Sequence, residues 1–510
     1  MGRIAVALII SSWMIPISIL VNRIVPQPYM DEIFHVPQAQ QYCKANFTSW
    51  DPMITTPPGL YFVSLAHVAS LFPGIYFLND ASAFSDACST SILRFTNGVL
   101  AVICGVLIYD IITHLRPALN DRKATFFALV LALYPLHWLF TFLYYTDVAS
   151  LTAVLATYLT SLKKNYWISA LLGAVAVLMR QTNIIWILFI VCSGVIKLTL
   201  DEKKDNRLLE RSGMSEIKGA DSTSSKGATN GSNLRKRRSG NHVDILSYSV
   251  APSTVHAIPH SAGLCEEIQN MLSKLWQLKW ELFSSFGPFF LVFVAFVAFV
   301  YWNGSIVLGA KDAHKVSPHF AQLLYFSLVT ALFMAPVHFS SGQFVALAQS
   351  LWKNKLCSFF QLVIALTVSF LSVHFFSIAH PYLLADNRHY TFYLWRKVIK
   401  THWMMKYLLV PLYVYSWFSI SNILVKTQKK MWVVAYFLAS AATLIPAPLI
   451  EFRYYTIPFF FLILHSHVDD TISWLLMGLL YIAINFFTMC MFLWRPFSWN
   501  HEPGLQRFIW

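Results

Sequence analysis

The sequence predicts an all-α polytopic membrane protein. Of its 510 residues, 56% are hydrophobic and only 12% are charged, and the mean hydropathy is +0.54. Average soluble domains contain about 25% charged residues, so much of this chain's surface is expected to face lipid. Two further observations support this class: the apolar residues form long runs, and the basic residues gather between alternate runs.

The apolar runs define the expected helices. A membrane-spanning helix needs about 20 mainly apolar residues, and a partly sheltered helix needs fewer. The first run follows Arg3 and lacks a small-residue cleavage site, so we expect a retained anchor rather than a cleaved signal peptide. In total we predict about 13 transmembrane helices, at residues 4–24, 91–114, 124–143, 147–162, 166–179, 183–198, 286–302, 321–338, 357–379, 404–424, 431–447, 454–468 and 472–494.

Basic residues in the connecting loops predict the orientation. They follow the second, fourth, sixth, eighth and tenth expected spans, which places all five loops on the side of the N-terminus. Loops rich in Lys and Arg remain in the cytosol. The net charge of +14 therefore reflects membrane topology, and we do not expect a nucleic-acid partner. The lumenal side then receives residues 25–90, 303–320, 380–403, 448–453 and 495–510.

Composition divides the chain into three parts. Residues 199–262 are rich in Ser, Lys, Asn, Gly and Arg and poor in aromatics. Such a segment cannot bury enough apolar surface to offset its chain entropy, so we expect a disordered cytosolic loop. On either side lie an N-terminal transmembrane module, 1–198, with a lumenal loop at 25–90, and a C-terminal module, 263–510, with lumenal loops at 380–403 and 448–453.

Two kinds of modification are expected on the lumenal side. Asn46 and Asn303 begin glycosylation sequons there, whereas the sequon at Asn230 falls on the cytosolic side. Cys43 and Cys88 both lie in the first lumenal segment, and the sequence leaves their pairing open. No cysteine spacing typical of a metal site is present.

The first polar cluster lies where the first span emerges. Asp31, Glu32 and Asp51 are candidates for the general base of a sugar transfer, because a carboxylate can accept the proton of an attacking hydroxyl. Alternatively, Asp31 or Glu32 caps a short lumenal helix. His35 would bind phosphate, orient a carboxylate or satisfy a local hydrogen bond.

A second cluster follows the ninth expected span. Arg388 and His389, between Asp386 and Tyr390, suit a lipid phosphate, because a guanidinium binds oxyanions in a fixed geometry and stabilises a phosphate leaving group. The alternative is a basic and aromatic interfacial anchor, which better fits Arg396 and the following lysine.

Two smaller clusters fall on the same side. Glu451 and Arg453 follow Pro448, which disfavours regular helix, and they either line a site or form an ordinary interfacial ion pair. Arg180 lies in a polar break between two apolar runs and is costly there unless it is paired or at the interface. Four polar clusters on one side predict a single lumenal site.

These motifs resemble those of one family. They are Tyr29-Met-Asp-Glu-Ile-Phe-His-Val-Pro-Gln-Ala-Gln, Trp50-Asp-Pro-Met-Ile-Thr-Thr-Pro-Pro-Gly-Leu-Tyr61, Arg180-Gln-Thr-Asn, Ala385-Asp-Asn-Arg-His-Tyr-Thr-Phe-Tyr393 and Glu451-Phe-Arg-Tyr-Tyr-Thr-Ile-Pro458. The family is the endoplasmic-reticulum α-1,2-glucosyltransferases that add the last glucose to the dolichol-linked oligosaccharide. The resemblance covers nearly the whole chain except about 200–265.

The resemblance implies a glycosyltransferase of the GT-C class with a helical first lumenal loop, in the endoplasmic-reticulum membrane. Its donor would be dolichyl phosphate β-glucose, and its acceptor the dolichyl-diphosphate oligosaccharide Glc2Man9GlcNAc2. The new linkage is α, so the anomeric centre inverts. Enzymes of this class place a catalytic acid in the first lumenal loop, which favours Asp31 as the base, and no cofactor or metal is expected.

Two alternatives remain at this level. One is another GT-C transferase that uses a dolichyl-phosphate sugar at a different step. The other is a transporter or channel-associated protein, which should carry ionisable residues at mid-span and often an internal repeat. Here the charged residues lie mainly at the ends of the expected spans, and no repeat is visible.

Overall fold

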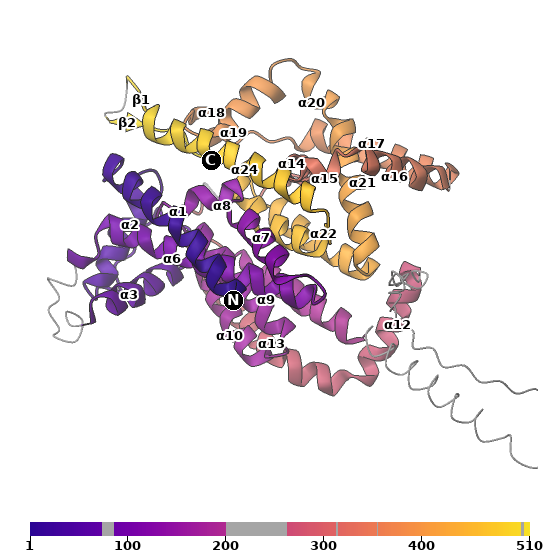
Figure 1. The fold of residues 1–510 in the computed structure, drawn as a ribbon, viewed down its shortest axis with the longest axis horizontal. Coiled ribbons are helices and arrows are strands. Elements are labelled where there is room, and N and C mark those ends of the chain that lie inside the picture. Colours follow the sequence, from indigo (N-terminus) through magenta and orange to yellow (C-terminus); the bar gives the residue numbers. More distant parts are fainter. Residues whose placement is uncertain (74–85, 200–262, 313–314, 354, 501–503) are drawn as a thin grey trace, which may run out of the picture. The chain divides into compact units, whose positions relative to one another are not determined.

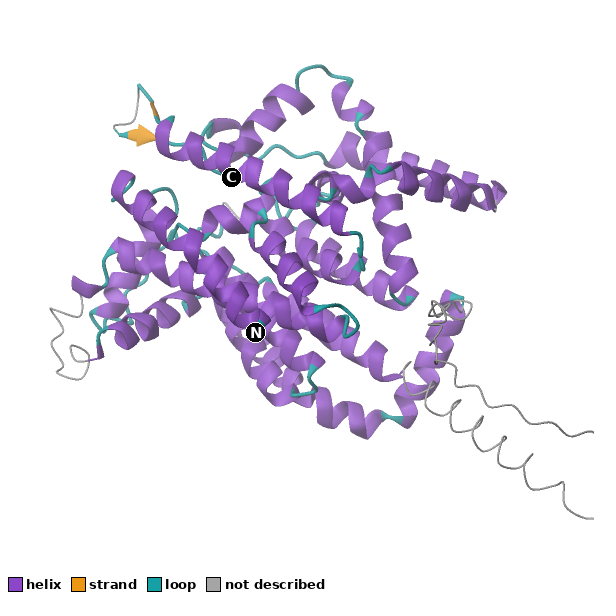
Figure 2. Cartoon of the chain, in the orientation of Figure 1, coloured by secondary structure: helices purple, strands orange, loops and turns teal. Residues whose placement is uncertain are grey.

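The computed structural model describes residues 1–73, 86–199, 263–312, 315–353, 355–500 and 504–510. Helices dominate these residues (Figure 2). The chain divides into two compact units, one formed by Met1–Val195 with Lys279–Trp510 and the other by Ile196–Leu278. The loop expected to be disordered, 199–262, lies outside the described residues except for its first residue, which ends a helix.

Six of the described helices are long and apolar enough to cross a membrane, which confirms a polytopic α-helical membrane protein. Their boundaries agree with the expected spans to within a few residues, apart from an earlier start of α13. They are α1 (Gly2–Ile24), α6 (Thr90–Leu115), α13 (Lys279–Asn303), α17 (Lys355–Phe376), α24 (Thr471–Trp494) and the continuous pair α20 (Met405–Leu408) and α21 (Val410–Thr427).

Shorter helices occupy the other expected spans. The prediction of one continuous helix at 124–143 and of another at 321–338 is wrong. Each stretch is interrupted near a proline, Pro135 or Pro336, because proline lacks the N–H that would continue the helical hydrogen bonds. The span at 454–468 begins in a 3-10 turn, η2 (Phe452–Tyr455). The shorter helices are α7 (Asp121–Ala132), α8 (Pro135–Phe140), α9 (Thr146–Leu162), α10 (Tyr166–Met179), Asn183–Thr199, α14 (Ala321–Phe333), α15 (Ala335–His338), α22 (Lys430–Leu444) and α23 (Thr456–His465).

Helix α9 is buried along almost its whole length and packs against α6 and α10. It is rich in Ala, Ser and Thr, and such small residues let neighbouring helices approach closely. Asp147 lies in its first turn. This packing fixes the beginning of α9, and with it Asp147, inside the larger unit.

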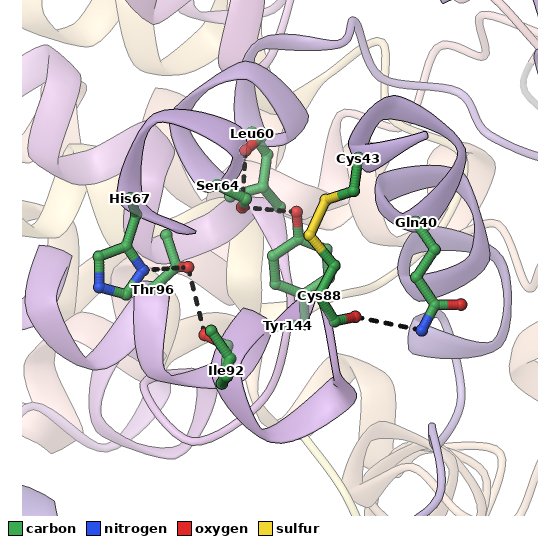
Figure 3. The surroundings of a disulfide bond; sticks show 9 residues. All are labelled: Gln40, Cys43, Leu60, Ser64, His67, Cys88, Ile92, Thr96 and Tyr144. Atoms are coloured by element: carbon green, nitrogen blue, oxygen red, sulfur yellow. Dashed lines mark hydrogen bonds between the residues drawn. A yellow bond between two sulfur atoms is a disulfide. The ribbon is translucent and has the colours of Figure 1, made fainter. Parts of the chain in front are cut away.

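The segment between the first two long helices contains α2 (Glu32–Cys43) and α3 (Gly59–Leu71). A disulfide joins Cys43 at the end of α2 to Cys88 just before α6, which answers the question that the sequence left open (Figure 3). Beside it, the hydroxyls of Ser64 and Tyr144 are 2.7 Å apart. The disulfide and this contact tie α2 and α3 to the body of the helices.

The C-terminal residues return to the middle of the larger unit. After α24, strands β1 (Phe497–Ser498) and β2 (Leu505–Gln506) form an antiparallel hairpin. Ile509 then pairs in parallel with His389, so that the C-terminus lies beside α19 and α24 (Figure 1). The remaining elements are α12 (Leu264–Gln277), α16 (Ser341–Lys353), α18 (Pro381–Ala385), α19 (Tyr390–Leu394) and the π-helix η1 (Trp395–Ile399).

Candidate active site

Asp31 is the most accessible carboxylate of a buried charge cluster. It follows Met30, whose φ of 57° turns the chain sharply before α2. Its Oδ2 lies 3.1 Å from Nη1 of Arg453, and 42% of its side chain is exposed. Its backbone N–H donates to the Tyr145 hydroxyl at 3.1 Å. The carboxylate is therefore held by its main chain and one guanidinium but keeps an open face.

The electrostatic surroundings keep Asp31 ionised. Burial acts to raise its pKa, but the positive charge of Arg453 and its hydrogen bond to the carboxylate leave that pKa below the ordinary value of an aspartate. A proton acceptor is thus available at neutral pH.

Arg453 connects the carboxylates of the cluster. Its Nη2 lies 2.6 Å from Glu451, and its Nη1 lies 3.6 Å from Asp147. The guanidinium also lies 5.5 Å from the ring centres of Phe140 and Tyr145, where a cation is attracted to the ring face. The structure thus brings the first and third predicted clusters together through one residue.

Arg180 completes the cluster. Its Nη1 lies 3.1 Å from Asp147 Oδ1, and the guanidinium lies 5.9 Å from the ring centre of Tyr454. Asp147 therefore bridges Arg180 and Arg453, although it was not among the predicted site residues. Its position at the start of α9 was the available signal, since a carboxylate at the edge of an apolar run needs a partner.

Glu32 has a different environment from Asp31. Its side chain is fully buried against Arg94, with Oε2 and Nη2 2.6 Å apart. Oε1 accepts from Arg94 Nε and the Tyr144 N–H, and Oε2 also accepts from the Tyr29 N–H. Each carboxylate oxygen thus accepts two hydrogen bonds from the protein. This geometry fits a structural anchor rather than a base. Sequence reasoning missed Arg94, although an arginine in the first turn of an apolar span must be paired.

The side chains of His35 and Asp51 point to partners outside the Arg453 cluster. His35 Nδ1 lies 2.6 Å from the Tyr61 hydroxyl, and burial lowers the pKa of His35, so its imidazole is neutral at neutral pH. Asp51 accepts the N–H of Met53 at 2.8 Å and caps the turn at the start of its loop. Within the described residues, the one hydrogen bond between these two residues and the cluster is from the backbone N–H of His35 to the Asp31 carbonyl, at 3.1 Å.

The segment 386–390 presents a second set of charges. Arg388 pairs with Asp386 at 2.7 Å, and burial, which would raise the pKa of Asp386, is outweighed by this guanidinium, so that pKa is lowered. His389 Nδ1 donates to the Trp510 carbonyl at 3.0 Å, and its Nε2 lies 3.8 Å from Asp386. The predicted phosphate-binding residues are therefore held in one turn.

An apolar cavity of about 990 Å³ begins next to these charges. Its walls come mainly from α14, α24, α19, η1 and the residues before Arg453, and among the described residues that line it Lys397 is the one with a charged side chain. Tyr390 and Phe452 line it, and they directly follow His389 and precede Arg453. The cavity thus joins an apolar space to both charged segments.

The two expected glycosylation sites differ in exposure. Asn46 is exposed, and its amide oxygen accepts from the Thr48 hydroxyl of the same sequon at 3.1 Å. Asn303 is the last residue of α13 and is half-buried, with its amide N–H groups donating to the carbonyls of Ser305 and Val307. These positions favour Asn46 as the acceptor.

Comparisons with known proteins identify the family of the chain. The sequence model of the DIE2/ALG10 family matches residues 25–464. A protein of Arabidopsis thaliana is 59% identical over 513 residues that cover all of both chains, and proteins of Mus musculus and Yarrowia lipolytica are 35% and 30% identical over 96% of this chain and 94% of theirs. All three carry the name Dol-P-Glc:Glc(2)Man(9)GlcNAc(2)-PP-Dol alpha-1,2-glucosyltransferase. No solved structure matches this chain. The chain belongs to the DIE2/ALG10 family.

Proposed function

We propose that this protein transfers glucose from dolichyl phosphate glucose to Glc2Man9GlcNAc2-diphosphodolichol, forming an α-1,2 linkage with inversion. The relatives' names supply the two substrates and the linkage. The observation that carries the proposal is the open, ionised Asp31 in a cluster where an apolar cavity ends. An acceptor hydroxyl needs an ionised carboxylate that can take its proton, and a lipid-linked donor needs an apolar cavity for its lipid chain.

Asp31 acts as the general base. It accepts the proton of the acceptor's 2-hydroxyl while that oxygen attacks the anomeric carbon on the face opposite the phosphate, which turns a β-glucosyl donor into an α-linked product. Arg453 holds the carboxylate at 3.1 Å and keeps it ionised. Glu451 and Asp147 hold Arg453 in turn, so the base is oriented through a chain of ion pairs.

The donor occupies the second part of the site. Arg388 and His389 bind the phosphate and stabilise the negative charge that grows as dolichyl phosphate departs. The lipid chain of the donor lies in the apolar cavity beyond Tyr390 and Phe452. Arg180, Glu451 and His35 support the sugar-binding side of the cluster.

We also propose a GT-C architecture with about 13 transmembrane helices in the endoplasmic-reticulum membrane and a lumenal active site. Two modules, 1–198 and 263–510, flank a cytosolic loop at 199–262. The Cys43–Cys88 disulfide supports a lumenal first loop, because structural disulfides persist in oxidising compartments. Five basic loops support the same orientation.

In vitro transfer tests the function directly. Purified protein in detergent should transfer glucose from synthetic dolichyl phosphate glucose to Glc2Man9GlcNAc2-diphosphodolichol but not to an acceptor that already carries three glucoses. If the protein forms product with an acceptor that carries one glucose and none with an acceptor that carries two, it would catalyse an earlier glucose transfer instead. If the protein transfers glucose to no acceptor but moves lipid across the membrane of reconstituted vesicles, the alternative that it is a transporter would be favoured.

Replacing Arg453 should change the pH dependence of turnover. Arg453→Met removes the cation that lowers the pKa of Asp31, so that pKa rises and the acidic limb of the kcat profile should move to higher pH. Arg453→Lys keeps the charge and should leave the limb near its wild-type position, although at a lower rate. An unchanged limb in Arg453→Met would show that Asp31 does not govern it.

Arg388 should be needed for donor binding. Arg388→Ala should be nearly inactive and should raise the donor KM, whereas Arg388→Lys keeps the charge but loses the forked geometry and should be clearly impaired. His389→Ala should be milder. Arg396 is the matched control, because it is exposed and lies 5.9 Å from the Phe392 ring, as expected for an interfacial anchor. If Arg388→Ala instead raises the acceptor KM alone, Arg388 binds the oligosaccharide lipid.

A further inference from the structure

Residues 507–510, here called the 507–510 segment, follow β2 and lie against the predicted phosphate-binding turn. The N–H of Ile509 donates to the Arg388 carbonyl at 2.9 Å, and the N–H of Tyr390 donates to the Ile509 carbonyl at 3.1 Å. Just before the segment, Gln506 accepts from Arg388 Nη1 at 3.0 Å. The segment therefore fixes the main chain on both sides of His389.

The other side of the 507–510 segment is held by the chain that leads to Asp31. The Tyr29 hydroxyl donates to the Arg507 carbonyl at 2.6 Å and accepts the Arg507 N–H at 2.7 Å. Ile509 is buried in the same core cluster as Tyr29, Phe140 and Tyr145. Since Tyr29 is two residues before Asp31, the 507–510 segment connects the base with the phosphate-binding turn.

Trp510 contributes both its backbone and its ring. Its carbonyl accepts the Nδ1–H of His389, which fixes that histidine's orientation. Its ring lines the apolar cavity, with its centre 4.9 Å from that of Tyr390 and 6.2 Å from that of Phe452. Tyr390 and Phe452 are the cavity residues next to the charged segments, so Trp510 lies at the charged end of the cavity. In the proposed function, this is the end where the lipid of the donor joins its phosphate.

Two polar groups at this end are unsatisfied. Within the described part of the chain, the Trp510 indole N–H and the Tyr390 hydroxyl are buried and have no hydrogen-bond partner. Buried donors are normally paired, and an unpaired one costs about 1–3 kcal/mol. A phosphoryl oxygen of a lipid phosphate is an acceptor that would satisfy them.

From these contacts we infer that Trp510 determines specificity for the lipid phosphate of the donor: its ring packs on the first lipid carbons, and its N–H donates to the phosphate. This inference rests on the proposed function and extends it to a residue outside the predicted motifs. The 507–510 segment holds Trp510, His389 and Tyr29 in one arrangement.

Kinetics of Trp510 variants test the inference. Trp510→Ala should raise the KM for dolichyl phosphate glucose about 10- to 100-fold, the equivalent of losing one buried aromatic side chain, with the acceptor KM unchanged. Trp510→Phe keeps a ring but no N–H and should give an intermediate donor KM. Trp494→Ala is the control, because Trp494 ends α24 with 57% of its surface exposed and should leave both KM values at the wild-type level.

Several outcomes would overturn the inference. An unchanged donor KM in Trp510→Ala, a rise in the acceptor KM alone, or a Phe variant no better than Ala would each do so. If Trp510→Ala does not fold, Trp510→Leu retains apolar volume without the ring or N–H and should still raise the donor KM. Glucose transfer by the wild-type protein separates the two proposals. If the wild-type protein transfers no glucose, the proposed function fails. If it transfers glucose normally and the Trp510 variants leave the donor KM unchanged, only the inference about Trp510 is rejected.

Discussion

Replacing Asp31 with asparagine should lower turnover by about 10²–10⁴-fold, the usual contribution of a general base. The asparagine retains the size of the side chain and can still accept a hydrogen bond from Arg453, so we expect normal expression and a donor KM near the wild-type value. What is lost is the acceptor of the 2-hydroxyl proton, and that affects only the chemical step. Single-turnover glucose transfer with both substrates saturating measures this step directly.

Asp51→Asn is the matched control for this prediction. Asp51 lies in the same loop segment and caps a turn through the N–H of Met53, a hydrogen bond that an asparagine side-chain oxygen can also accept. Its turnover should therefore stay within a few-fold of wild type. Wild-type turnover in Asp31→Asn would transfer the role of base to another carboxylate of the cluster, Asp147 or Glu451.

The positions of the helices could be predicted because membrane helices carry a local signal. Each of the six long apolar helices in the described part of the chain coincides with an expected run, since the lipid interior requires both an apolar surface and a satisfied backbone. Breaks within runs were harder to predict. Pro135 and Pro336 interrupt the expected helices, but proline also occurs inside α1 and α13 without ending them, so the residue alone does not decide the outcome.

The candidate site could be predicted in its parts but not in its connections. Asp31, Arg180, Arg388 and Arg453 were recognised as polar residues next to apolar runs and by resemblance. The contact between Asp31 and Arg453 joins residues that are 422 positions apart, and no local pattern encodes such a pair. For the same reason the residue types alone did not separate Glu32 from Asp31, and only the resemblance favoured Asp31, although one is buried by Arg94 and the other is open.

The Glu32–Arg94 pair should make a large contribution to stability. Its N···O distance of 2.6 Å equals that of Arg3–Asp110, but its side chains are 0% and 1% exposed, whereas Arg3 is 63% exposed. Arg94→Met leaves a buried carboxylate without its counter-ion, which should cost about 3–5 kcal/mol. Arg3→Met should cost less than about 1 kcal/mol, because an exposed pair is largely screened. Unfolding in detergent, followed by circular dichroism, compares the two variants.

Glu32→Gln then separates an anchor from a base. The amide retains the shape of the side chain, and Arg94 keeps the carbonyls of Val25 and Gln27 as acceptors, so this variant should lose less stability than Arg94→Met. In the double variant the two losses should not add, because both remove the same interaction. Turnover per folded molecule should stay near wild type in Glu32→Gln, the reverse of Asp31→Asn. A stable Glu32→Gln protein with turnover lowered by about 10²-fold or more would make Glu32 the base and leave Asp31 as a partner of Arg453.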